Sequence, residues 1–351
     1  MSIVADQYTF VVGVDTHART HTYAILTGGG RLVDQKEFPT QPAGVSRALD
    51  WIGRRTAGDI SGTLLSVEGT GSYGAQLTAT AAGHGYRVVE APLPTRHGQG
   101  KTDSLDAQRA ARNVLPVEQD RLRDHRRHDG QRDVMQALTV ARDHLQTHRT
   151  ATINALTAHL RVHDLDLDAR KALTPAQIRT IAAWRTRNED PSTAALRQIA
   201  VDYARDIATL DEKLATNHAT LDQLTAREAP ELRAITGIGP VTAAVILAAW
   251  SHPGRVRDEA AFAMLAGVAP IPASSGNTHR HRLNRGGDRQ LNRGLHTMVS
   301  TRLSHKDPAT IAYYQRRRNE GKTDKEIRRC LKRFIARKIY RTLTAARLDT
   351  A

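Results

Sequence analysis

The stretch Tyr8-Thr-Phe-Val-Val-Gly-Val-Asp15 is an apolar run rich in β-branched residues, and it ends on a carboxylate. Such a run is typical of a buried strand. Outward from it, residues 21–26 and 32–38 have the same character and flank a turn of three glycines at 28–30. A glycine turn between two such runs predicts a hairpin, so we expect the chain to begin with three antiparallel strands.

Helical and extended patterns then alternate. Apolar residues at helical spacing predict a helix over 42–55, and 63–68 is a second buried strand. A helix over 73–84 and a strand over 86–90 follow. This order, β-β-β-α-β-α-β, resembles that of the ribonuclease-H-like fold, and the expected order of the strands within the sheet rests on that analogy.

The rest of the chain is predicted to be mainly helical. Residues 103–165 and 195–226 carry apolar residues mostly every three to four positions, which favours long amphipathic helices suited to a coiled coil or bundle. A turn and a new helix cap are expected at Thr174-Pro175, so the two helices could form an antiparallel arm. We therefore expect three domains, an α/β domain, a helical arm and a glycine-punctuated C-terminal domain, at 1–115, 116–228 and 229–351.

Charge is concentrated near the C-terminus. The 351 residues include 51 Lys or Arg and 36 Asp or Glu, a net charge of +15. Residues 279–341 alone hold 19 Lys or Arg and five acids, a net +14. This favours a polyanionic partner, most simply nucleic acid, held by the C-terminal third. A merely solvated basic face is the alternative. The tail 313–341 is expected to be a basic amphipathic helix packed on the last domain.

Composition excludes other classes. The single cysteine, Cys330, rules out a disulfide framework and a cysteine-type zinc site. We find no N-terminal signal pattern and no apolar run of the ~18 residues that a membrane span needs. The expectation is a cytoplasmic, nucleoid-associated protein without a membrane partner.

Four carboxylates carry the catalytic hypothesis. Asp15 and Glu68 each end a predicted strand, and Asp103 and Asp106 share one helix face because they are three residues apart. Grouped acids are costly unless cations neutralise them, so we expect two Mg²⁺ ions, for which Mn²⁺ could substitute. Alternatively, Asp15 is an ordinary cap, and Asp103 is a helix N-cap with Asp106 in the first turn. His17 could support the site or be a plain surface histidine.

A glycine motif, Ile235-Thr-Gly237-Ile-Gly239, precedes an apolar helix. This is the helix-hairpin-helix pattern, in which Gly237 and Gly239 allow close approach of a phosphate to a helix N-terminus. It predicts sequence-independent binding to the DNA backbone. A simple tight turn between helices is the alternative.

A loop containing Ser274, Ser275 and Gly276 lies beside dense cations. His279 and His281 alternate with arginines, which favours phosphate contact over metal binding. From the residues alone, a loop serine carries no chemistry. The candidate phosphate-binding arginines are Arg280, Arg282, Arg285, Arg289 and Arg293.

The motifs Gly13-Val-Asp15-Thr-His, Val67-Glu68-Gly-Thr-Gly-Ser-Tyr73 and Lys101-Thr-Asp103-Ser-Leu-Asp106-Ala resemble those of the insertion-sequence-110 transposases. That resemblance covers nearly the whole chain. It implies a metal-binding domain similar to the RuvC Holliday-junction resolvase and a C-terminal transposase domain. It also implies that Ser275, with Ser274 as the adjacent alternative, is a nucleophile that joins covalently to DNA. Relatives carry Gly-Asn where this chain has Gly287-Asp288.

The resemblance further implies a double-stranded DNA substrate and an element-encoded guide RNA. Ser275 is far from the acids in sequence, so we expect a dimer or tetramer in which one subunit's serine meets another's carboxylates. Two other functions stay open at this stage. One is a structure-selective endonuclease that uses water as its nucleophile, and the other is a nucleic-acid-binding protein without activity.

Overall fold

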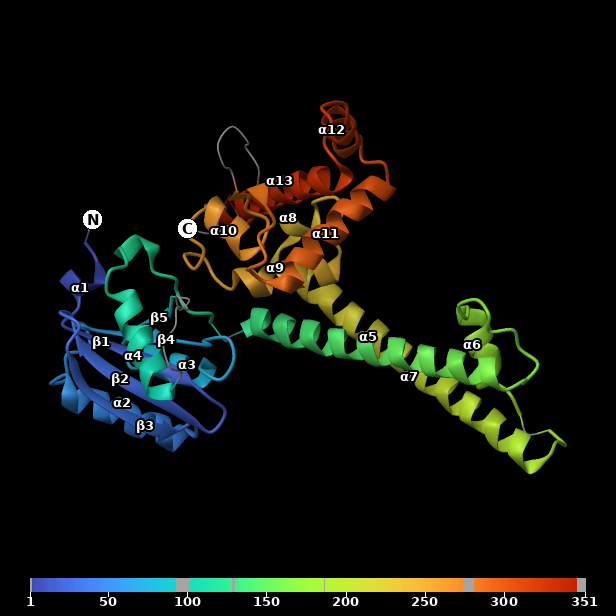
Figure 1. The fold of residues 1–351 in the computed structure, drawn as a ribbon, viewed down its shortest axis with the longest axis horizontal. Helices are drawn as coiled ribbons and strands as arrows, with labels where there is room; N and C mark the ends of the chain where they lie inside the picture. Colours follow the sequence, from blue (N-terminus) through green and yellow to red (C-terminus); the bar gives the residue numbers. More distant parts are fainter. Residues whose placement is uncertain (1, 93–101, 128–129, 186, 274–280, 346–351) are drawn as a thin grey trace. The chain divides into compact units, whose positions relative to one another are not determined.

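A computed structural model of the protein describes residues 2–92, 102–127, 130–185, 187–273 and 281–345 (Figure 1). The chain divides into two compact units. The first contains Met1–Gly130, Ala249–His296 and Pro308–Ala351, and the second contains Gln131–Ala248 and Thr297–Asp307. The division into domains at 1–115, 116–228 and 229–351 stays a prediction.

The first unit contains a five-stranded sheet with the strand order β3-β2-β1-β4-β5. Its strands are β1 (Phe10–Thr16), β2 (Thr20–Thr27), β3 (Leu32–Pro39), β4 (Thr63–Val67) and β5 (Arg87–Glu90). β2 is antiparallel to both β1 and β3, whereas β1, β4 and β5 run parallel. The antiparallel start and the strands that follow it are confirmed. The mixed, mostly parallel sheet is consistent with the ribonuclease-H-like order expected from the sequence.

Helices cover both faces of this sheet. On one face, α2 (Pro42–Arg55) and α3 (Ala75–Gly83) share a core with Val12 and Val14 of β1. On the other face, α4 (Asp103–Val114) and the short α1 (Val4–Gln7) pack around Val11. Alternate residues of β1 therefore face opposite layers, as the two-residue period of a strand requires.

Gly13 lets α4 lie directly on β1. A Cβ atom at Gly13 would stand 2.0 Å from the carbonyl oxygen of Ala107 and 2.5 Å from the amide nitrogen of Ala111. The face of α4 that meets the sheet is built from small residues, including Ala107, Ala110 and Ala111. The Ser66 hydroxyl on β4 donates to the carbonyl of Ala110 over 2.7 Å. Strand and helix are thus in backbone contact.

The second unit contains two long helices, α5 (Gly130–Val162) and α7 (Pro191–Glu228), which lie side by side in Figure 1. Contacts of Leu138 and His159 with Asn217 and Leu196 show that they run antiparallel. The predicted antiparallel arm is confirmed. Between them, Thr174 begins α6 (Pro175–Ala182) with a capping box, as expected at that position.

The helix expected over 103–165 is interrupted. α4 ends at Val114, and Pro116 follows, a residue that cannot donate a helical hydrogen bond. The described residues 115–127 contain one turn of 3₁₀ helix, η1 (Gln119–Arg121), before α5 begins.

The C-terminal third is helical apart from one small hairpin. Its helices are α8 (Pro230–Arg233), α9 (Pro240–Trp250), α10 (Glu259–Leu265), α11 (Arg289–Ser304), α12 (Pro308–Asn319) and α13 (Asp324–Ala345). The hairpin pairs β6 (Ile271–Pro272) with β7 (His281–Arg282). No helix in the described ranges is both long and apolar enough to cross a membrane.

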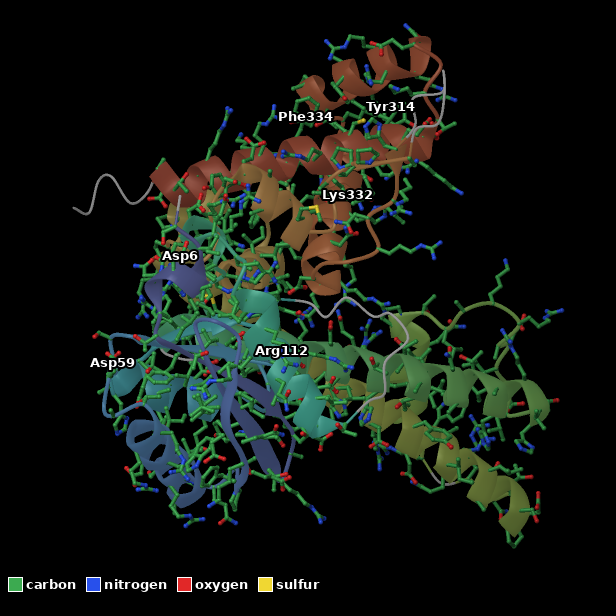
Figure 2. All side chains as sticks on the ribbon, turned by 60° about the vertical axis from the view of Figure 1, so that its left-hand side comes forward. Asp6, Asp59, Arg112, Tyr314, Lys332 and Phe334 are labelled. Carbon is green, nitrogen blue, oxygen red and sulfur yellow. The ribbon has the colours of Figure 1, made fainter. Side chains whose placement is uncertain are left out.

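The single basic helix predicted over 313–341 is wrong in one respect, because two helices occupy these residues. α12 ends before Gly321, whose φ of +79° is easily reached only by glycine. The Thr323 hydroxyl then accepts from the amide of Glu326 and starts α13. Side chains of α13, including Lys332 and Phe334, are labelled in Figure 2.

A buried ion pair joins the sheet to the C-terminal part of the same unit. Arg255, 5% exposed, donates to the carboxylate of Glu90 at the end of β5 over 2.8 Å and to the carbonyl of Ala249 over 2.8 Å. Burial raises the pKa of Glu90, but the charge and hydrogen bond of Arg255, together with the charges of Arg123 and Arg126, outweigh burial and hold that pKa below its ordinary value. The pair therefore keeps its charges.

Substitution of Gly13 tests the contact between β1 and α4. Gly13→Ala should lower the free energy of unfolding by about 3 kcal/mol or more, because the new methyl group meets backbone atoms that cannot swing aside. Gly83→Ala is the matched control, since a Cβ atom there meets nothing within 4 Å. Denaturant unfolding followed by circular dichroism measures both. Equal stability of the two variants would contradict the close contact.

Candidate functional site

The fold puts Asp15 on the α4 face of the sheet and Glu68 directly after the end of the neighbouring strand. Val11 and Gly13 of β1 face α4, so Asp15, two residues further along, lies on the same face. Ser66 of β4 contacts α4, and Glu68 follows directly after the last residue of that strand, Val67. Both residues stand at the carboxyl ends of neighbouring parallel strands.

Backbone bonds fix these two strand ends against each other. Val14 and Val67 are register partners, and the amide of Glu68 donates to the carbonyl of Val14 over 3.0 Å. The hydroxyl of Thr16 donates to the carbonyl of Glu68 over 3.0 Å. Asp15 lies within β1, one residue before that strand ends at Thr16, and the alternative that it is an ordinary cap before the turn stays open.

The third element is the first turn of α4. Its N-cap is Thr102, whose hydroxyl accepts from the amide of Leu105 over 3.3 Å. The alternative in which Asp103 is the N-cap is therefore wrong. Asp103 and Asp106 both lie in the first turn, where the helix dipole favours carboxylates.

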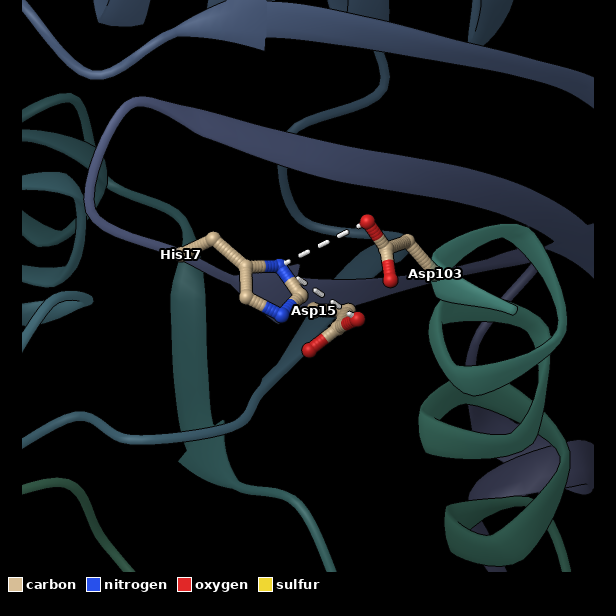
Figure 3. A group of neighbouring side chains, drawn as sticks. All are labelled: Asp15, His17 and Asp103. Carbon is tan, nitrogen blue, oxygen red and sulfur yellow. Dashed lines mark ion pairs between the residues drawn. The ribbon is translucent and has the colours of Figure 1, made fainter. Parts of the chain in front are cut away.

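Asp15, His17 and Asp103 come together in space (Figure 3). Nδ1 of His17 lies 3.7 Å from a carboxylate oxygen of Asp15 and 3.9 Å from one of Asp103. One ligand atom from each residue lies within 4.8 Å of the other two. Asp15 is buried, whereas His17 and Asp103 are exposed, so the group opens to solvent on one side.

Among the described residues, Glu68 and Asp106 stand outside this group. Asp106 forms an ion pair of 2.6 Å with Arg109, one turn along α4. Sequence reasoning left His17 undecided between a supporting role and a plain surface position. The missed signal was again the strand alternation, because His17 is two residues beyond Asp15 and just past the end of β1.

The group fits a divalent cation. Carboxylate oxygens are the preferred ligands of hard divalent ions. Two carboxylates held this close repel each other unless positive charge lies between them. Asp15 and Asp103 would therefore hold the ion, with His17 in reach as a further donor.

The two glycines of the helix-hairpin-helix motif differ in whether the fold could accept a larger residue. Gly237 has φ of +88°, and a Cβ atom there would lie 3.3 Å from the carbonyl oxygen of Met298. At Gly239 a Cβ atom would meet nothing within 4 Å. Gly239 is exposed at the start of α9, where its carbonyl accepts from Ala243. Glycine is thus required by the fold at Gly237, but at Gly239 the space beside the backbone is open.

The candidate arginines within the described residues are all exposed. They lie on β7 and around the start of α11, and they are Arg282, Arg285, Arg289 and Arg293. Asp288 accepts from the amide of Leu291 over 3.0 Å and so caps α11, as an asparagine could. Ser274, Ser275 and Arg280 lie outside the described residues.

The sheet, the acidic group and the basic C-terminal third are features of an enzyme that acts on nucleic acid. A family profile for DEDD transposases of the IS110 type matches residues 12–163, and the profile of the "Transposase IS116/IS110/IS902 family" matches residues 229–315. The chain therefore belongs to the IS110 family of transposases. Such domains are those of enzymes that cut and rejoin DNA.

Three relatives come from insertion elements. The chain is 24% identical to the IS116 44.8 kDa protein of Streptomyces clavuligerus over 88% of each chain. It is 32% identical to the IS110 43.6 kDa protein of Streptomyces coelicolor over 38% of this chain and 33% of that protein. For the IS900 42 kDa protein of Mycobacterium paratuberculosis the identity is 30%, over 44% of this chain and 39% of that protein. The last two matches therefore span little more than a third of each relative.

Removal of either grouped carboxylate tests metal binding. Asp15→Asn and Asp103→Asn should each weaken Mn²⁺ binding by about tenfold or more, because each removes one anionic ligand. Titration calorimetry on protein first stripped with EDTA measures this affinity. Asp202→Asn, an exposed acid on α7, is the control and should bind Mn²⁺ as the wild type does. Unchanged affinity in both site variants would exclude the group as a metal site.

Proposed function

We propose that the protein is the transposase of an insertion sequence and exchanges DNA strands at a metal site formed by Asp15, Glu68, Asp103 and Asp106. The observation that carries the proposal is the meeting of the Asp15 and Asp103 carboxylates at the edge of the sheet. Family membership adds support, because the match over residues 12–163 includes all four acids.

The chemistry assigns a task to each part of the chain. Mg²⁺, as two ions for which Mn²⁺ can substitute, would polarise the scissile phosphate and lower the barrier to attack. The carboxylates hold the ions, and exposed arginines such as Arg282 and Arg289 bind the phosphate oxygens. Burial of Asp15 beside an open side of the group leaves access for a phosphate without exposing every ligand to water.

The nucleophile in this proposal is Ser275, with Ser274 as its neighbouring alternative. Its hydroxyl oxygen gives up its proton and bonds to phosphorus while the bond from phosphorus to a deoxyribose oxygen breaks, and the released sugar oxygen takes up a proton in turn. The phosphoserine ester keeps the energy of the phosphodiester, so a second DNA hydroxyl can rejoin the strand without ATP. A serine hydroxyl needs activation at neutral pH, which a nearby metal site supplies.

Partners follow from the same proposal. Gly237, Gly239 and the N-terminus of α9 act as a helix-hairpin-helix that binds the backbone of double-stranded DNA. An element-encoded RNA supplies sequence choice by base pairing. The arm of α5 and α7 joins subunits as a coiled coil into a dimer or tetramer, so that the serine of one subunit reaches the carboxylates of another.

The two hairpin glycines give a test of DNA binding. Gly239→Ala should leave folding unchanged but weaken binding to a DNA duplex, because the methyl group fills the open space that a phosphate would occupy. Gly237→Ala should instead cost about 1–2 kcal/mol of stability, since its φ is left-handed. Thermal unfolding and fluorescence anisotropy with labelled duplex separate the two effects. Unchanged duplex affinity in Gly239→Ala would contradict the backbone contact.

Covalent trapping tests the nucleophile. Wild-type protein incubated with substrate DNA, the native RNA and Mg²⁺ should yield a protein–DNA adduct that survives denaturing electrophoresis. Ser275→Ala should abolish that adduct, and the matched control Ser274→Ala should retain it. The reverse pattern would assign the nucleophile to Ser274. DNA cleavage that persists without an adduct in both variants would favour a structure-selective endonuclease that uses water.

A further inference from the structure

A cleft of about 580 Å³ lies along α13, between the β6–β7 hairpin and the turn that joins α12 to α13. Its size is within the ~300–1,000 Å³ range of ligand sites. The cleft belongs to the first unit and is separate from the group of Asp15, His17 and Asp103, whose residues do not line it.

Positive charge dominates the walls of the cleft. Five cationic side chains line it against one acid, and they are Arg282, Lys322, Arg329, Lys332 and Arg333, with Glu326 as the acid. Two of the cations already have partners, because Arg333 pairs with Glu259 and Lys332 donates to Asn292 over 3.0 Å. No ion pair within 4.0 Å joins Arg282, Lys322 or Arg329 to another described residue, although the hydrogen bonds from Thr323 and the charges of Lys322 and Arg329 lower the pKa of Glu326. Three charges therefore point to an anionic ligand.

An aromatic ring stands among these charges. The Phe334 side chain is 50% exposed, although it is apolar. Its ring meets the edge of Tyr313 at a centroid distance of 5.2 Å and an interplanar angle of 75°, and the Arg337 guanidinium lies 5.8 Å from its centroid. Phe334 is thus held in place with half of its surface open. Leu283, 51% exposed, adds a second apolar contact on the wall of the cleft.

The geometry points to a binding site for an unpaired nucleotide of a single-stranded DNA or RNA segment. The base packs on Phe334 and its phosphates contact Arg282, Lys322 and Arg329. This inference rests on the proposed action on nucleic acid and adds the form that the nucleic acid takes at this site. The phosphates of a duplex could contact the cations, but its bases could not pack on Phe334, because they are stacked inside the double helix.

Anisotropy titrations with four labelled probes test the site in the full-length protein. The probes are an oligothymidylate of about 15 nucleotides, an oligouridylate and an abasic strand of the same length, and a matched DNA duplex. Phe334→Ala should weaken binding of a base-bearing single strand by about 5- to 150-fold, the range for one stacked base. The abasic strand and the duplex should bind as tightly as they do to the wild type. If Phe334→Ala weakens binding of the oligouridylate more than that of the oligothymidylate, the natural ligand is RNA, and the opposite order indicates DNA.

Two further variants separate stacking from folding. Phe334→Leu keeps an apolar side chain against Tyr313 and should lose single-strand affinity as Phe334→Ala does, whereas Phe334→Trp should retain it. Equal losses on the abasic strand, or no loss on any single strand that the wild type binds, would overturn the nucleotide site and leave the proposed transposase intact. A wild-type protein that binds the duplex but none of the single strands would overturn the nucleotide site alone, and one that binds none of the four probes would also contradict the proposed backbone contact with DNA.

Discussion

The missing side chain at Gly13 is the constraint on which the rest of the acidic site depends. Because β1 has no Cβ atom there, the backbone of α4 lies against the strand at Ala107 and Ala111. One turn before Ala107, the same helix carries Asp103, and two residues beyond Gly13 the strand carries Asp15. The close approach therefore sets how near these two carboxylates can come. A larger residue at Gly13 would separate them even if neither carboxylate were changed.

The charges of Asp15 and Asp106 have different surroundings in this arrangement. Asp106, on the flank of α4, has its charge matched by Arg109 within the helix. Asp15 is buried at a strand end and faces another carboxylate across less than 5 Å. A fold that holds like charges in this way gains most from a bound cation, because the cation removes repulsion that the protein itself creates. Such a group would therefore be more stable with a cation bound between its carboxylates than without one.

Much of the first domain could be predicted from sequence, because strand alternation and glycine turns are local signals. The helix at 42–55 has the predicted bounds, and the antiparallel start is as expected. The sequence did not predict the points at which a long helical pattern is divided into separate helices. Pro116 ends a helical pattern, and Gly321 divides the last basic helix within a stretch, 315–326, that has no apolar residue. The spacing of apolar residues predicts which face of a helix is buried, but it does not predict whether that face belongs to one helix or to two.

Of the four acids that the sequence singled out, the described structure groups Asp15 with Asp103, and it adds His17. Spacing placed Asp103 and Asp106 on one helix face, yet it could not show that Arg109, three residues further, would pair with Asp106. Likewise, strand alternation places His17 on the same face as Asp15, but it could not show that the ring also lies near Asp103. Those outcomes depend on how closely α4 approaches the sheet, which is a tertiary property.

The buried pair of Glu90 and Arg255 bears on how acidic and basic parts of the chain work together. A buried ion pair adds little net stability, since desolvation offsets most of the attraction, but loss of one partner leaves an uncompensated charge. Such a pair therefore favours one arrangement of the segments it joins over others. Here it joins β5 to the segment after α9, 165 residues apart, inside one compact unit. That unit contains the carboxylates of the sheet and most of the basic C-terminal third. The acidic edge of the sheet, with Asp15 and Asp103, and the exposed Arg282 and Arg289 therefore belong to one compact unit.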